Sequence, residues 1–180
     1  MRDRRSTAYH EAGHAVAQAH FRLKIKKVAI VRHGDSLGHM KGRMATNSSI
    51  EYDNNSGRAQ LGVERDVMVF LAGRAAQREF MPRSVRSYHG RSDYKWAAEL
   101  LGRLASGEEL PVYFKLLEIR VKGFVKKPLV RAQIEGVAKE LLIRKTLTDK
   151  QVKAVIQDAT QRDFDERVKE CRKRERHRNK

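Results

Sequence analysis

Two histidines and a glutamate near the start of the chain, in the run His10-Glu11-Ala12-Gly13-His14, have the spacing of a catalytic metal site. Residues four apart on a helix project from the same face, so His10 and His14 can bind one ion through their imidazole nitrogens. Glu11 directly follows the first histidine, and its carboxylate can therefore take a proton from a water polarised by the ion. The pattern predicts zinc-dependent hydrolysis of a peptide bond, with Glu11 as the general base that later protonates the leaving amine.

A zinc site of this kind needs a third protein ligand, and the sequence offers two candidates. His20 lies six residues after His14, but a continuous helix would rotate it by about 240° and displace it by about 9 Å from His14. It could reach the same ion only if the helix broke near Ala17. Asp93 stands at the start of a predicted helix, where an aspartate more often caps the helix than binds a metal. Spacing alone leaves both candidates open.

The elements that must position these residues are predicted to be mainly helical. Apolar residues recur at helical spacing over most of the chain. Ser92 is expected to cap its helix, Pro128 to open another, and Thr148 with Gln151 to form a capping box. The predicted helices cover residues 4–21, 59–80, 92–104, 108–122 and 128–142, with a last helix from residue 148.

A small β element is predicted between the first two helices. Residues 25–32 are rich in β-branched side chains, residues 33–35 form a turn, and residues 36–43 form a weaker strand. Residues 44–57 are dominated by polar side chains and are expected to be an exposed loop. The predicted fold class is therefore mainly α with a small β element.

Composition indicates one domain, at residues 1–166, followed by a basic tail at residues 167–180. The 39 Lys and Arg residues exceed the 22 Asp and Glu residues, which gives a net charge of +17. This charge could attract nucleic acid or an acidic partner. The single cysteine, Cys171, excludes an internal disulfide. No apolar run is long enough to cross a membrane, and no secretory signal is recognised, so we expect a cytoplasmic protein.

Several further motifs resemble the peptidase domain of the FtsH family of zinc proteases. They are TAYHEAGHAVA, KKVAIVRHGDSLGHM, FLAGRAAQREF, GRSDYKWAAELL and EGVAKELLIRKTLTDKQV, in that order over about residues 5–157. The resemblance implies a helical zinc peptidase fold, with His10, His14 and Asp93 as the zinc ligands and Glu11 as the base. It also implies that residues 25–42 lie along the substrate groove. The segment around Asp93 departs from the family pattern at His89 and Arg91, and His89 is a further candidate ligand.

The predicted function is hydrolysis of unfolded or flexible polypeptides by a zinc endopeptidase. The alternative is a non-catalytic zinc-containing module that binds nucleic acid or an acidic partner through its basic surface. Members of the resembled family carry a membrane anchor and an ATPase module, and neither is recognised in these 180 residues. We therefore do not predict ATP dependence, and we expect either a homo-oligomer or a separate ATPase partner.

Overall fold

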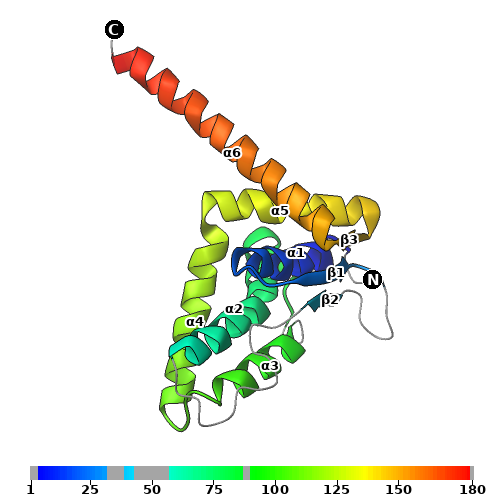
Figure 1. The fold of residues 1–180 in the computed structure, drawn as a ribbon, viewed down its shortest axis with the longest axis vertical. Coiled ribbons are helices and arrows are strands. Elements are labelled where there is room, and N and C mark those ends of the chain that lie inside the picture. The colour runs from blue at the N-terminus through cyan, green and yellow to red at the C-terminus, as the bar shows by residue number, and fades with distance from the viewer. Residues whose placement is uncertain (1–3, 32–38, 43–56, 87–89, 179–180) are drawn as a thin grey trace.

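Helices form most of the chain in the computed structural model, which describes residues 4–31, 39–42, 57–86 and 90–178 (Figure 1). The mainly helical fold with a small sheet confirms the predicted fold class. The elements in chain order are α1 (Arg4–His20), β1 (Ile25–Ala29), β2 (His39–Gly42), α2 (Gly57–Phe80), the short 3-10 helix η1 (Pro82–Ser84), α3 (Arg91–Leu101), α4 (Glu109–Lys126), α5 (Pro128–Arg144), β3 (Thr146–Thr148) and α6 (Asp149–Arg178).

Helix α1 lies in the middle of the body, between α2 and α5 (Figure 1). Its small residues Ala8, Ala12 and Ala15 are fully buried, and this lets the neighbouring helices approach closely. Gly13 is a point of close approach, because an added Cβ there would lie 2.6 Å from the Ala72 carbonyl oxygen of α2. The glycine in the middle of the helix, which costs about 1 kcal/mol relative to alanine, is thus explained by packing.

The sheet has three antiparallel strands in the order β2-β1-β3. Val28 in the central strand pairs with Met40 on one side and with Leu147 on the other. The third strand was not predicted, because three residues are too few to show a period of two. Strand β2 forms one edge of the sheet, on the side opposite to β3.

Helix termini agree with the sequence at two of the three predicted positions. Helix α5 begins at Pro128 as predicted. The capping box before α6 is confirmed: the Thr148 backbone N–H donates to the Gln151 side chain at 2.9 Å, and the Gln151 N–H donates to the Thr148 hydroxyl at 3.4 Å. The prediction that Ser92 caps α3 is wrong. Helix α3 begins at Arg91, and its cap is Gly90, two residues before Ser92, with a φ of 70° that suits glycine.

Helix α6 packs against α5 at its start and then projects away from the body (Figure 1). It is continuous from residue 149 to 178, so the predicted domain boundary at residue 167 coincides with no break in secondary structure. Phe164 and Cys171 on its outer part are exposed. None of the helices in the described ranges is both long and apolar enough to cross a membrane. The predicted turn at 33–35, residues 44–56 of the predicted loop, and His89 lie outside the described residues.

Candidate metal centre

Three side chains from two helices meet on one side of α1. His10 and His14 extend from α1, and Asp93 extends from the first turn of α3. The Nε2 atoms of His10 and His14 are 3.0 Å apart, and Asp93 Oδ2 lies 3.1 Å from the first and 3.6 Å from the second. Two helical residues four apart and Asp93, 83 positions after the first of them, therefore direct one ligand atom each to the same point.

The three distances suit a tetrahedral metal ion. Zinc binds imidazole nitrogen and carboxylate oxygen at about 2.0–2.1 Å, and tetrahedral geometry then separates neighbouring ligand atoms by about 3.3 Å. The observed separations of 3.0, 3.1 and 3.6 Å scatter around this value. Two imidazoles and one carboxylate would leave the fourth position of such an ion open, as in catalytic rather than structural zinc sites.

The orientation of His14 is fixed from behind. Its Nδ1–H donates to the Val69 carbonyl oxygen of α2 at 2.8 Å. In the neutral imidazole, Nε2 then carries a lone pair directed at the cluster, which is the form that binds a metal. The ring lies against Gly73 of the same helix, where an added Cβ would be only 2.3 Å from Nε2.

Electrostatics in the cluster favour a positive charge. Burial opposes the charged form of His14, but Asp93, Glu11 and the Val69 carbonyl outweigh it and raise the pKa of His14 to about 9. Burial likewise opposes the charged form of Asp93, yet the two histidines hold the pKa of this carboxyl below its usual range. The negative groups that favour a proton on His14 would equally favour a divalent cation bound at this point.

Glu11 lies one residue along α1 from the first histidine and is buried, with 5% of its surface exposed. Burial raises the pKa of its carboxyl, and the nearby Asp93 raises it further, while His10 and His14 lower it. A carboxyl shifted towards neutral pH is suited to exchange a proton with a reacting group.

Comparisons with known proteins identify the family. A family model described as Peptidase family M41 matches residues 1–101, which include all four residues of this site. The chain belongs to peptidase family M41. The resemblance to the FtsH peptidase domain that the motifs indicated is confirmed by this match and by an FtsH protein that aligns along most of the M41 chain.

One curated relative is "ATP-dependent zinc metalloprotease FtsH 4" of Sphaerobacter thermophilus. It is 34% identical over 169 residues, an alignment that covers 89% of the M41 chain. The M41 chain spans only 23% of the length of that relative.

The other candidate ligands lie elsewhere or outside the described part of the M41 chain. Helix α1 continues through Ala17 to His20. The His20 ring packs against Phe124, with 4.9 Å between the ring centres, and does not join His10, His14 and Asp93. Burial and Lys127 lower the pKa of His20. His89 is not among the described residues.

Two contributors to the site were not predicted from the sequence. Val69 acts through its backbone carbonyl, which any residue would supply, so its type gave no signal. Gly73 did leave a signal, because a glycine inside a long core helix usually has a packing reason.

Proposed function

We propose that this chain is a zinc-dependent endopeptidase of the HExxH type, with His10, His14 and Asp93 as the zinc ligands and Glu11 as the general base. One observation carries the proposal: two imidazole nitrogens and a carboxylate oxygen lie within 3.6 Å of one another. Membership of a peptidase family and the zinc metalloprotease named among its relatives support it.

Each residue has a distinct part in this mechanism. A bound zinc ion would supply Lewis-acid chemistry, polarising the scissile carbonyl and lowering the pKa of water to about 7. His14 keeps Nε2 free for the ion by donating Nδ1–H to Val69. Asp93 would hold the ion through its carboxylate and offset part of its positive charge. The Glu11 carboxylate would take a proton from the attacking water and pass it to the leaving amine nitrogen.

The substrate we propose is an unfolded or flexible polypeptide. Strand β2 lies at the edge of the sheet, where an extended peptide can add through backbone hydrogen bonds. A peptide bound in this way must be free of its own secondary structure, which favours flexible segments over folded ones.

We also propose that any ATP-driven unfolding comes from outside these 180 residues, whether from another module or from a separate ATPase. The relative whose name includes ATP dependence is far longer than this chain, which spans 23% of it. Assembly into a homo-oligomer and action in the cytoplasm complete the proposal, and the free cysteine suits a reducing compartment.

A glutamine substitution at Glu11 tests the proposal. Wild-type protein should bind about one zinc ion per chain and cleave denatured casein. Glu11→Gln should keep the zinc and lose at least about 100-fold in rate, because it removes only the base. The matched control is Glu99→Gln on α3, whose side chain is exposed and pairs with Lys95. This control should cleave at the wild-type rate.

Two results would overturn the proposal. One is zinc-loaded wild-type protein that cleaves no unfolded substrate, and the other is full activity in Glu11→Gln.

The basic outer part of α6 suggests the alternative, a module that binds nucleic acid or an acidic partner. That alternative would be favoured if the wild-type protein cleaved no substrate, and if the wild-type and Glu11→Gln proteins bound nucleic acid equally, with an affinity that falls steeply with salt.

A further inference from the structure

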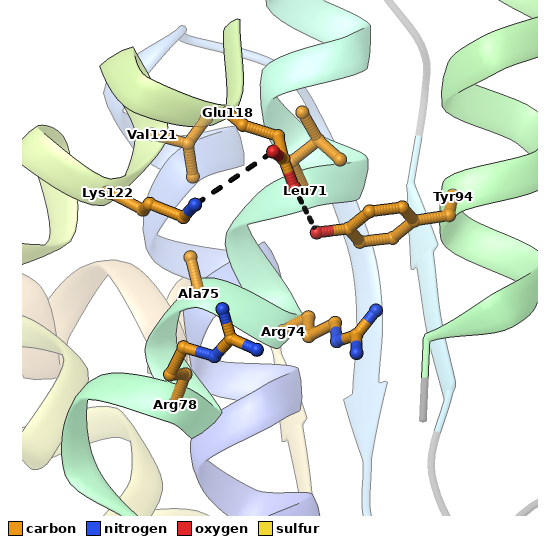
Figure 2. Close-up of a pocket in the computed structure, with 8 residues that line it drawn as sticks. All are labelled: Leu71, Arg74, Ala75, Arg78, Tyr94, Glu118, Val121 and Lys122. Atoms are coloured by element: carbon orange, nitrogen blue, oxygen red, sulfur yellow. Dashed lines mark hydrogen bonds and ion pairs between the residues drawn. The ribbon is translucent and has the colours of Figure 1, made fainter. Parts of the chain in front are cut away.

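A pocket with three basic side chains lies between α2, α3 and α4, next to the proposed zinc site. Arg74 and Arg78 enter it from α2, Lys122 enters from α4, and the ring of Tyr94 closes it on the α3 side. Figure 2 shows the Lys122 side chain directed toward Glu118, with Arg78 on the same side of the pocket, whereas the Arg74 guanidinium is directed away from both, toward Tyr94. The Arg74 guanidinium lies over the Tyr94 ring, 5.0 Å from its centre.

The one acidic side chain lining this pocket, Glu118, already has other partners. Its carboxylate accepts a hydrogen bond from the Tyr94 hydroxyl at 2.7 Å. The second carboxylate oxygen, Oε2, lies 3.4 Å from Lys115 Nζ and 3.9 Å from Lys122 Nζ. Within the described ranges, neither Arg74 nor Arg78 forms an ion pair. Arg74 Nε is moreover buried without a hydrogen-bond acceptor. Two guanidinium groups therefore face the pocket without an anion to balance them.

The pocket adjoins the proposed zinc site through the backbone of two helices. Tyr94 directly follows the proposed ligand Asp93, and Arg74 directly follows Gly73, which lies against the His14 ring. Gly90 joins the two, because an added Cβ there would lie 3.4 Å from the Asp93 carboxylate and 3.5 Å from Arg74 Cβ. Arg74 therefore lies close to the Asp93 carboxylate, so a polypeptide bound at the proposed zinc site can also reach the pocket.

We propose that this pocket binds a carboxylate of the polypeptide substrate, either an acidic side chain close to the scissile bond or the C-terminal carboxylate. This inference rests on the proposed peptidase function. A guanidinium group matches a carboxylate with two parallel hydrogen bonds, and such charge-assisted pairs are about twice as strong as neutral ones. The pocket would thus select acidic substrates.

Peptide binding to zinc-loaded Glu11→Gln protein tests the proposal without turnover. Three fluorescently labelled flexible peptides of one sequence are compared by anisotropy: one with a central Asp and an amidated C-terminus, one with Asn in its place, and one with Asn and a free C-terminal carboxylate. The Asp peptide or the free-acid peptide should bind about tenfold more tightly than the neutral peptide. Which of them does so identifies the source of the carboxylate.

Substitutions of Arg78 locate the effect in the pocket, and we choose this residue because its exposed side chain is not needed for packing. Arg78→Gln should reduce the tenfold preference to about threefold, and Arg78→Glu should abolish it. The matched control is Arg65→Gln, an exposed arginine of α2 that does not line the pocket. It removes the same net charge and should leave the preference unchanged.

Two results would overturn the pocket proposal: equal affinity for all three peptides, or a preference that Arg65→Gln reduces as much as Arg78→Gln. Because anisotropy reads binding alone, these outcomes are separate from failure of the proposed function, which shows as absent cleavage by the wild-type protein. A carboxylate preference without any cleavage would overturn the peptidase proposal and locate a carboxylate-binding pocket in a non-catalytic protein.

Discussion

Substitution of Gly73 by alanine should disrupt metal binding although Gly73 is not a ligand. The residue lies on α2 against the imidazole of His14, and an added Cβ would be 2.3 Å from Nε2, 2.6 Å from Cε1 and 2.8 Å from Cδ2. The ring cannot turn away without giving up the hydrogen bond from Nδ1 to the Val69 carbonyl. One extra methyl group therefore moves the nitrogen that we propose as a ligand.

The size of this effect follows from the distances. Ordinary contacts of a Cβ begin at 3.4 Å, so the ring and the new methyl group must separate by about 1 Å. A zinc–nitrogen bond tolerates a deviation of only about 0.2 Å. Loss of a partner that orients a ligand costs about 10–100-fold in metal affinity, and displacement of the ligand itself should reach at least the upper end of that range.

Chelator competition on purified protein measures this affinity, and circular dichroism shows whether the fold survives. The matched control is Gly123→Ala in α4, where an added Cβ meets nothing within 4 Å. This control should keep wild-type zinc affinity and gain about 0.5–1 kcal/mol of stability, because alanine favours a helix. Wild-type zinc affinity in a folded Gly73→Ala protein would refute the described contact between Gly73 and His14.

Three further predictions concern the ligands and the fold. Although burial opposes its charge, Asp93 raises the pKa of His14 to about 9. The charged His14 side chain therefore stabilises the fold fully below pH 6.5, and this stabilisation is lost as the pH rises through about 9. Urea denaturation of the zinc-free protein should accordingly give a lower free energy of unfolding at pH 9 than at pH 6.5. Zinc content should fall in Asp93→Asn and be unchanged in His20→Ala; the reverse would exclude Asp93 as the ligand. Thr148→Ala should cost about 1 kcal/mol in the same urea assay through loss of the capping box, and an unchanged midpoint would contradict this.

Local patterns were sufficient to predict much of the fold. The helical period places His10 and His14 on one face, and it also separates them from His20, as the uninterrupted α1 shows. The capping box at Thr148 was readable because its two partners lie three residues apart. These features depend only on residues close together in the chain.

Features that depend on tertiary packing could not be predicted in this way. Asp93 lies 83 residues from His10, and only the family resemblance singled it out. The start of α3 was misjudged because Gly90, in a left-handed conformation, takes the place of a side-chain cap. Residues of three helices line the basic pocket, and no spacing within any one of them indicates that Arg74 and Lys122 line the same pocket.

A crystal of the zinc-loaded protein, with anomalous diffraction recorded at the zinc absorption edge, tests the central claim most directly. We predict one strong peak about 2 Å from Nε2 of His10, Nε2 of His14 and a carboxylate oxygen of Asp93. A zinc peak bound by His20, or by any set of residues without Asp93, would contradict the account.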